Sequence, residues 1–244
     1  MNVVFETLRR FFANDVVQFA LICLSIVAAL ILLAWLVEHF LCKNRLRLSS
    51  PKYLTTVAVS AALASVLMLL EIPLLFLVPS MYKLDFSELP VLICSFYLGP
   101  AAGVLTEFLK ILLKLLFKQT TTAMVGELAN FLVGCSLVLP ASIIYHLKRS
   151  KKNAILGLIT GTVVMTAFGS LFNAFYLLPT FAKMFGLPLD SIIGMGTAIN
   201  HRITNLTTFV LFSVAPLNLI KGTTVSILSM LLYKRTEVVM FKRF

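Results

Sequence analysis

The chain alternates long apolar segments with short stretches of polar, mostly basic residues. The apolar segments, each a candidate helix, cover residues 16–41, 54–70, 91–98, 101–117, 124–147, 154–181 and 203–233. A helix needs about 20 predominantly apolar residues to cross a bilayer, and all but one of these segments reach or approach that length. No stretch alternates apolar and polar residues as the roughly ten-residue strands of a membrane barrel do. The pattern predicts an all-α integral membrane protein.

The segment 91–98 is the exception, because it is too short to cross a bilayer unaided. It follows a loop of proline and polar residues, "LVPSMYKLDFSELP", at positions 77–90. Such backbone is tolerated at membrane depth only where it is buried in protein or lines a cavity. We therefore expect a broken or tilted helix packed inside the bundle. A cavity is expected at the outer face, between this loop and the later helices.

Composition supports the membrane assignment. Of the 244 residues, 59% are hydrophobic and 13% are charged, whereas a soluble domain has about 25% charged residues. The net charge is +11, and lysines and arginines gather in the stretches 43–52, 148–152 and 234–243. The positive-inside rule places these stretches and the C-terminus in the cytoplasm, and anionic lipid headgroups account for the charge more simply than nucleic acid does. We expect a multi-pass protein of the cell membrane.

Sequence motifs of common enzyme classes are absent. The chain contains no GxxxxGK[ST] phosphate-binding loop and no HExxH zinc motif. The cysteines have no CxxC pair and are interpreted as small buried hydrophobic residues rather than disulfides or metal ligands: Cys23, Cys42, Cys94 and Cys135. We expect no catalytic residue, no metal site and no cofactor.

Charged residues inside the predicted helices are candidates for function, because a charge in the membrane interior is costly. Glu107, Lys110 and Lys114 are spaced i, i+3 and i+7, so they share one helix face. One interpretation is an internal ion pair, with Lys114 extending to the membrane surface. The other is a polar stripe that faces a cavity or a partner subunit.

A second polar set lies near the C-terminus, in the stretch "APLNLIKG". Asn218 lies one helical turn before Lys221, and neither has a carboxylate three or four residues away. Lys221 either extends to the surface, helped by a helix break near Pro216, or belongs to a binding site. Asn173, the amide of the segment 154–181, supports the second interpretation. Three polar side chains that converge in an apolar cavity would fix the orientation of a small molecule.

Small residues mark one face of the second apolar segment. Ala58 and Ala62 stand four positions apart in "AVSAALA", a spacing that lets membrane helices approach closely. On these residues alone the pattern predicts a packing face and nothing more specific.

Four ordered blocks carry a resemblance to a known family: "YKLDFSELPVLICSFYLGPAAGVLTEFLK" (82–110), "GELANFLVG" (126–134), "FNAFYLLP" (172–179) and "APLNLIKG" (215–222). With the alanines of "AVSAALA", they make residues 52–235 resemble the S components of energy-coupling factor (ECF) vitamin transporters, and the riboflavin-specific ones most. The resemblance implies a six-helix subunit whose outward pocket is covered by the first outer loop. It also implies partnership with a T component and two ATPases, and delivery of the vitamin by toppling of the subunit in the membrane.

The resemblance further implies roles for individual residues. Ligand contacts of the riboflavin-binding members carry over to residues of the loop and of the later helices: Leu84, Asp85, Phe86, Asn130, Asn173, Asn218 and Lys221. Ala58 and Ala62 would contact the T component. The transported ligand is expected to be riboflavin or FMN.

Two regions depart from the pattern of the family. The segment 16–41 has no counterpart in the usual six-helix subunit. We therefore expect an extra N-terminal hydrophobic helix and basic linker in residues 1–50, and the six-helix domain in residues 51–244. The outer loop 181–202 is longer than usual, which would change the cover of the pocket and the choice of ligand.

Two alternatives to the riboflavin assignment stay open. The chain could be an S component for a different vitamin, since these subunits share one fold. It could also be a stand-alone carrier driven by protons, with Glu107 or Glu127 as the relay.

Overall fold

The computed structural model describes residues 22–40, 50–120, 122 and 124–241, and the side chains of the last helix as far as residue 233. Its first helix covers Ile22–Phe40. The elements that follow are, in chain order, α2 (Pro51–Leu69), β1 (Ile72–Pro73), β2 (Lys83–Leu84), α3 (Glu88–Leu98), α4 (Pro100–Phe117), α5 (Val125–Leu147), α6 (Lys151–Phe172), η1 (Asn173–Leu177), α7 (Leu178–Phe185), α8 (Leu189–Thr197), α9 (Leu206–Phe209), η2 (Val210–Val214) and α10 (Ala215–Phe241). The segments η1 and η2 are π-helical turns.

Local sequence explains where several helices begin. Ser50 and Ser150 precede α2 and α6, and each side-chain oxygen accepts a hydrogen bond from the backbone N–H three residues later. Asn205 forms a capping box with Thr208 at the start of α9. Gly99 has a φ of 135°, a value that favours glycine, and this conformation lets α4 begin directly after α3.

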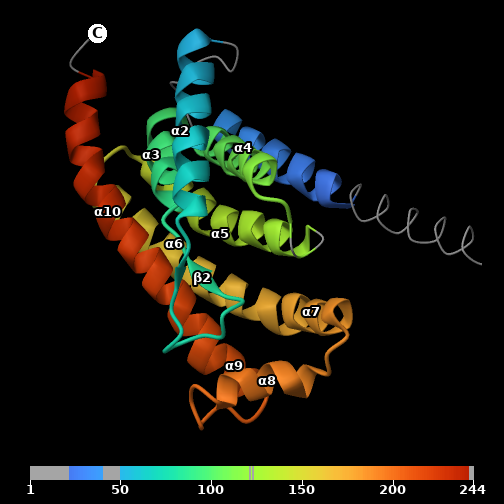
Figure 1. Cartoon of the computed structure of the whole chain (residues 1–244). Coiled ribbons are helices and arrows are strands. Elements are labelled where there is room, and N and C mark those ends of the chain that lie inside the picture. Colours follow the sequence, from blue (N-terminus) through green and yellow to red (C-terminus); the bar gives the residue numbers. More distant parts are fainter. Residues whose placement is uncertain (1–21, 41–49, 121, 123, 242–244) are drawn as a thin grey trace, which may run out of the picture.

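Helix α3 is the central element of the bundle. It contacts α2, α4, α5 and α10, and extensive contacts also join α5 to α6 and α6 to α10 (Figure 1). The largest core cluster is built from five helices and contains Ala64, Val91, Leu92, Phe96, Leu137, Val138, Ala141, Tyr145, Ala154, Leu158, Met165 and Val225. The segment 91–98 is thus a short helix packed inside the bundle, as its length predicted.

A second core cluster lies where α7, α8 and α9 meet, at one end of the molecule (Figure 1). Helix α6 continues through η1 into α7, so the helical stretch Lys151–Phe185 has 35 residues. Val125 and Ala129 of α5 pack against this cluster. The outer loop predicted at 181–202 is helical in part, because α8 lies within it and buries Ile192.

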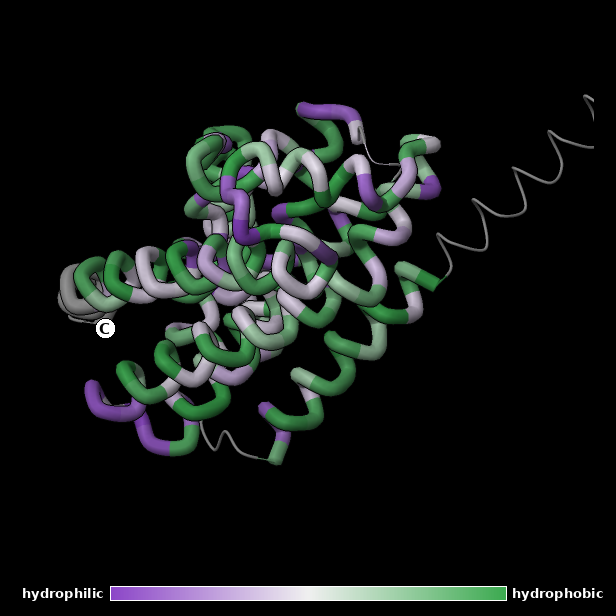
Figure 2. Tube along the Cα trace, turned by 90° about the horizontal axis from the view of Figure 1, so that it is seen from below, coloured by the Kyte–Doolittle hydropathy of each residue, from purple (hydrophilic) through white to green (hydrophobic). Residues whose placement is uncertain are grey.

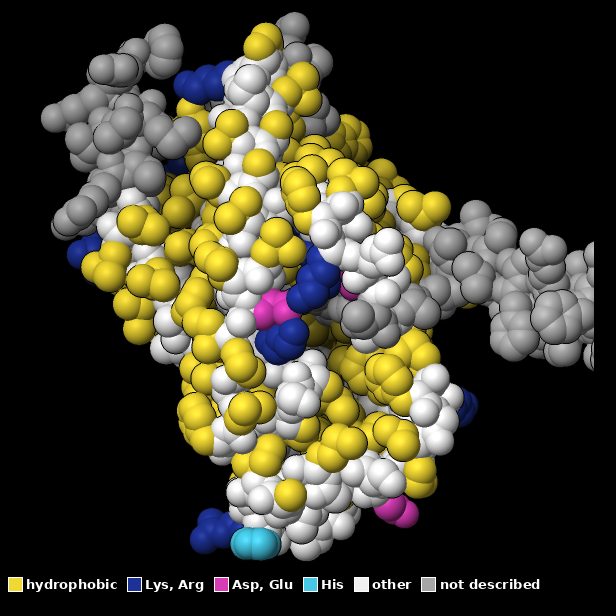
Figure 3. All heavy atoms as spheres, in the orientation of Figure 1, with side chains coloured by type: hydrophobic (Ala, Val, Ile, Leu, Met, Phe, Trp, Pro, Cys, Tyr) yellow, Lys and Arg dark blue, Asp and Glu magenta, His cyan; other side chains and the backbone are white. Residues whose placement is uncertain are grey.

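The outer surface of the bundle is apolar. Hydrophobic side chains are spread over the face in view in Figure 3, and Figure 2 shows hydrophobic residues throughout the helices. Leu63, Phe175, Leu211 and Leu231 expose between 56% and 81% of their surface. Within the described ranges, five helices are long and apolar enough to cross a membrane. The prediction of an all-α integral membrane protein is confirmed.

The first helix packs on the bundle as an added element. Val27 and Ala34 are buried against residues of α2, α4 and α5. Glu38 is also buried, and its Oε2 accepts a hydrogen bond of 3.1 Å from the backbone N–H of Ala101. That N–H belongs to the first turn of α4, where backbone donors lack helical partners. The extra N-terminal helix is confirmed, although the two ends of the predicted segment 16–41 lie outside the described residues.

Candidate ligand-binding site

The loop between α2 and α3, residues 70–87, folds back over the bundle. Its strands β1 and β2 pair antiparallel. Leu84 and Val78 are buried against Leu217 of α10, and Phe86 packs against the same cluster. The loop therefore contacts α10 one residue before the predicted ligand contact at position 218.

The amides of Asn173 and Asn218 meet beside Gly169 of α6. Asn173 donates from Nδ2 to the Gly169 carbonyl at 2.7 Å, and its Oδ1 accepts from Tyr82 Oη of the loop at 2.7 Å. The Nδ2 of Asn218 lies 2.6 Å from the place that a Cβ at position 169 would take, so the amide of Asn218 packs closely against Gly169. This Nδ2 is buried and has no hydrogen-bond partner among the residues that the structure describes. A buried donor without a partner is costly, and a ligand acceptor would satisfy it.

Lys221 is an ion-pair partner and not the unpaired lysine that spacing along its own helix predicted. Its Nζ lies 3.0 Å from Asp85 Oδ2 and 3.0 Å from Glu88 Oε1. Both carboxylates come from the junction of the loop with α3, which is why spacing along α10 does not find them. The interpretation that Lys221 extends to the surface is wrong, since 7% of the residue is exposed.

Lys110 of α4 belongs to the same cluster. Its Nζ lies 3.0 Å from Ser87 Oγ and 3.4 Å from Glu88 Oε1, and it also pairs with Glu107 one turn earlier on α4. All four residues are completely buried. The internal ion pair that spacing predicted is present, and the same lysine also contacts the loop–α3 junction.

The cluster holds more acidic than basic side chains. Three carboxylates, those of Asp85, Glu88 and Glu107, face the two ammonium groups of Lys110 and Lys221. The second oxygens of both glutamates are buried and unpaired within the described part of the chain. Burial by itself would raise the pKa of Asp85, which lies in the loop, but the nearby lysines and local hydrogen bonds lower it. Asp85 is therefore an anion held by Lys221 of α10 and stabilised by the nearby charge of Lys110.

Other predicted residues lie apart from this cluster. Asn130 is half-buried on α5, and none of the hydrogen bonds described for the site includes it. Lys114 pairs with Glu127 of α5 at 3.1 Å and does not extend to the membrane surface, because this carboxylate holds it between two helices. Ala58 and Ala62 are exposed on α2.

Sequence reasoning missed three members of the site. Tyr82, Ser87 and Glu88 all belong to the polar loop and the first turn of α3. Their signal in the sequence is a run of polar residues that must be buried at membrane depth. The sequence does not show which helix each of them meets. Among the cysteines, Cys23, Cys94 and Cys135 are unpaired, and Cys42 lies outside the described residues.

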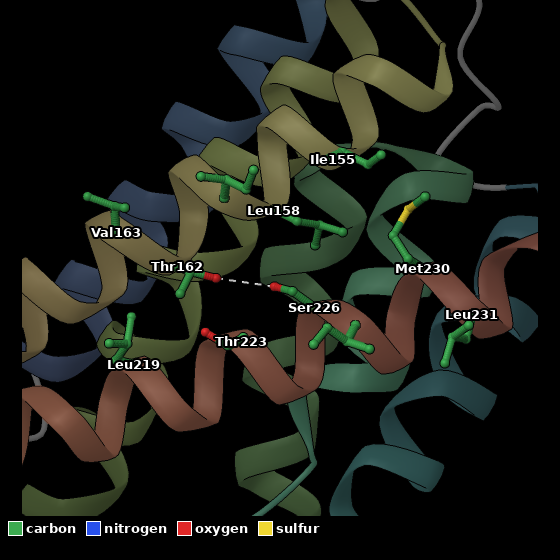
Figure 4. A pocket seen from close by; sticks show the side chains of 11 residues that line it. Ile155, Leu158, Thr162, Val163, Leu219, Thr223, Ser226, Met230 and Leu231 are labelled. Atoms are coloured by element: carbon green, nitrogen blue, oxygen red, sulfur yellow. Dashed lines mark hydrogen bonds between the residues drawn. The ribbon is translucent and has the colours of Figure 1, made fainter.

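Two apolar grooves are lined by residues of α6 and α10 other than those of the cluster. One, of about 440 Å³, runs between α6 and α10, where Thr162 and Ser226 are hydrogen-bonded at 3.2 Å (Figure 4). The other, of about 620 Å³, adjoins it beside α9 and η2. None of the predicted ligand contacts lines either groove. The candidate site is therefore the covered cluster beneath the loop.

Comparison with known proteins decides the family. The sequence model of the family "ECF transporter, substrate-specific component" matches residues 52–233. The chain belongs to this family. It is 38% identical over 193 residues to the riboflavin transporter RibU of Staphylococcus aureus (strain TCH60), and the match covers 79% of this chain and 94% of the relative. The riboflavin transporter FmnP of Bacillus subtilis (strain 168) is 30% identical over 183 residues, covering 75% of this chain and 90% of the relative.

A solved structure gives the same answer for the fold of this ECF subunit. The structure described as "Structure and mechanism of the S component of a bacterial ECF transporter" matches with a TM-score of 0.60 and 37% identity. The match covers 79% of this chain and 98% of the other. The family match begins at residue 52, so the helix Ile22–Phe40 lies outside it, whereas the whole candidate site lies inside.

Proposed function

We propose that this ECF substrate-specific component binds riboflavin at the outer side of the cell membrane. It works with a T component and two ATPases, which supply the energy, and it delivers the vitamin inward by toppling in the membrane. The names of the relatives RibU and FmnP, both riboflavin transporters, support the choice of ligand. The distribution of lysine and arginine supports a cytoplasmic C-terminus.

The observation that carries the proposal is the pair of amides beneath the loop. Asn173 and Asn218 come from two helical segments and both lie at Gly169, and the buried Nδ2 of Asn218 has no partner within the described part of the chain. Leu84 and Phe86 supply an apolar surface beside them. A flavin has matching chemistry, because its ring system is broad and apolar and carries carbonyl and imide groups at one edge. A few placed polar groups in an apolar site are typical of small-molecule recognition.

The residues of the proposed site come from the loop, α5, η1 and α10. They are Leu84, Asp85, Phe86, Asn130, Asn173, Asn218 and Lys221. Ala58 and Ala62, which are exposed on α2, are proposed to contact the T component. Their small side chains permit close approach of a partner helix.

The test is a binding titration on the purified full chain. Riboflavin fluorescence should be quenched at micromolar protein, and mass spectrometry of the purified protein should identify the bound compound. Asn218→Ala should weaken binding about ten-fold or more, as expected for a lost buried hydrogen bond. Ser226→Ala is the matched control, because Ser226 lies two turns later on α10 and lines the groove of Figure 4. An effect of Ser226→Ala without one of Asn218→Ala would place the ligand in the groove instead.

Competition and transport experiments test the remaining choices. Displacement of bound riboflavin by FMN, thiamine and folate ranks the candidate vitamins. Uptake is then measured in vesicles with and without the T component and ATPases. Uptake driven by a pH gradient in vesicles that lack these partners would refute the importer proposal in favour of a proton-coupled carrier.

A further inference from the structure

The groove between α6 and α10 in Figure 4 ends beside the basic start of α6. Its lining on α6 begins at Ile155, and α6 itself begins at Lys151. Lys151 and Lys152 precede Ile155 by four and three positions, and these spacings place residues on one face of a helix. Both lysines therefore stand at this end of the groove.

The positive charge at this end has no acidic partner. The basic residues of the run "KRSKK" (148–152) are exposed, and none of the ion pairs in the described part of the chain includes them. The sequence contains no aspartate or glutamate between Glu127 and Asp190. The N-terminus of α6 adds the partial positive charge of its free backbone N–H groups. Basic pockets between membrane helices bind anionic lipid headgroups, so an anionic lipid would balance this charge.

The groove itself suits a hydrocarbon chain. Ile155, Leu158 and Met230 are among the apolar side chains that line it (Figure 4). Thr162 and Ser226, which also line it, use their hydroxyl groups in a hydrogen bond with each other. A hydrocarbon chain needs no polar partner, and it gains van der Waals contacts with such a lining.

The length of the groove matches one leaflet of a bilayer. Its lining extends over residues 155–163 on α6 and 219–231 on α10. At 1.5 Å per residue these stretches span about 12 and 18 Å, close to half of the hydrocarbon core of about 30 Å. A membrane-spanning partner helix would need the whole thickness. The second groove, which shares Val163 and Leu219 with the first, extends away from the lysines.

We propose that the groove between α6 and α10 binds an acyl chain of an anionic phospholipid, with the phosphate group of the lipid at Lys151 and Lys152. The lysines recognise the charge of the headgroup, and the groove holds the chain, so tight binding needs both parts. The bound lipid bridges α6 and α10, the helices that also carry Gly169 and Asn218 of the candidate site. This lipid site is separate from the proposed vitamin site.

The headgroup is tested by native mass spectrometry of the full chain, purified in detergent and titrated with phosphatidylglycerol or phosphatidylcholine of the same acyl chains. We expect phosphatidylglycerol to bind about ten-fold or more tightly, because each lysine near an anionic headgroup contributes about five-fold. Lys151→Gln together with Lys152→Gln should abolish this preference. Lys183→Gln together with Arg202→Gln is the matched control, because it removes the same charge from exposed positions on α7 and in the loop after α8.

The groove is tested by filling it with a larger side chain. Thr223 is exposed and lines the groove (Figure 4), so Thr223→Phe should weaken the binding of both lipids by about five-fold or more. Ala167→Phe is the matched control, because Ala167 is exposed and lines only the second groove. It should leave lipid binding unchanged. Phosphatidylglycerol should also raise the unfolding temperature of the parent chain more than that of Thr223→Phe.

Several outcomes would overturn the proposal. Equal affinity of the parent chain for the two lipids, or a preference that survives the double lysine change, would refute the headgroup contact. Unchanged binding in a folded Thr223→Phe protein would place the lipid elsewhere, and Thr223→Leu decides this point if Thr223→Phe does not fold. Equal losses in Thr223→Phe and Ala167→Phe would indicate an occupant that spans both leaflets. These titrations contain no vitamin, so a failure of the proposed function leaves them valid.

Discussion

The loop between α2 and α3 is tied down in two places by similar ion pairs that differ in burial. In the outer tie, Glu71 lies 2.5 Å from Lys83 Nζ and 2.8 Å from Lys118 Nζ, and the lysine side chains are 41% and 43% exposed. In the inner tie, the Asp85 and Lys221 side chains are 6% and 9% exposed. An exposed ion pair stabilises by about 0–1 kcal/mol, whereas removal of one partner of a buried pair costs about 3–5 kcal/mol.

This difference indicates which tie determines the position of the loop. Water and salt screen the outer pairs, and their long side chains lose entropy when they are held. The buried charged groups of the inner tie have no water nearby that could replace a lost partner. The removal of one group therefore destabilises the groups that remain. The geometry of the site should therefore follow the inner tie and be nearly independent of the outer one.

The largest effect is expected from Lys110→Met. This change keeps the apolar stem but removes the cation that faces Glu107 and Glu88 from a completely buried position. We expect a loss of about 3–5 kcal/mol of unfolding free energy, because Glu107 loses its lysine and three carboxylates then face a single remaining ammonium group. Thermal unfolding of the parent and variant proteins, purified in detergent, measures this loss of stability.

A charge-compensated variant is the control for this prediction. Glu107→Gln together with Lys110→Met removes one charge of each sign and should recover part of the lost stability. If Lys110→Met unfolds at the same temperature as the parent chain, the buried ion pairs stabilise the protein no more than the exposed pairs of Glu71 do. The comparison between the two ties then fails.

Much of the fold could be predicted from the sequence, because long apolar segments predict membrane helices. The short segment 91–98 could also be placed inside the bundle, since eight residues cannot cross a bilayer. The ion pair of Glu107 and Lys110 follows from helical spacing. These features depend on neighbours along the chain.

The site could be predicted only in part, because its contacts join distant elements. Asn173 and Asn218 were found as amides in apolar helices, but their meeting point at Gly169 depends on how α6 and α10 cross. Lys221 was found as a buried charge, yet its partners Asp85 and Glu88 come from a loop whose path the sequence does not define. Spacing along one helix identifies only partners on that helix, so it does not identify these carboxylates.

An intermediate effect is expected at Glu38, which connects the first helix to α4 and lies outside the matched family region. Glu38 is 4% exposed, and its carboxylate accepts a hydrogen bond from the backbone N–H of Ala101 in the first turn of α4. Glu38→Ala should cost about 1 kcal/mol, the usual loss for a helix cap, and Glu38→Gln should cost less because its amide oxygen still accepts. Thermal unfolding of the two variants checks this order. Equal losses in both would mean that the charge, and not the cap, stabilises α4.

A smaller effect is expected from Glu71→Gln. The change removes the anion shared by Lys83 and Lys118 and should lower the unfolding free energy by less than about 1 kcal/mol. Thermal unfolding of the purified protein in detergent measures this loss. A loss as large as that of Lys110→Met would show that the outer ion pairs hold the loop as strongly as the buried ones.

The smallest effect is the pH dependence of that outer tie. Burial alone would raise the pKa of Glu71, but hydrogen bonds and charges of Lys118 and Lys83 lower it from its ordinary value of 4.5. Because the pKa of Glu71 is lower in the folded than in the unfolded state, ionised Glu71 stabilises the fold fully at pH values well above 4.5. This stabilisation is lost as the pH falls through the pKa of the folded state. The difference in unfolding temperature between the parent chain and Glu71→Gln should therefore be constant near neutral pH and shrink as the pH falls through 4.5 toward the lowered folded pKa. A difference that already shrinks near neutral pH would mean that the lysines do not hold Glu71 as an anion, and the outer tie would then be weaker than its geometry indicates.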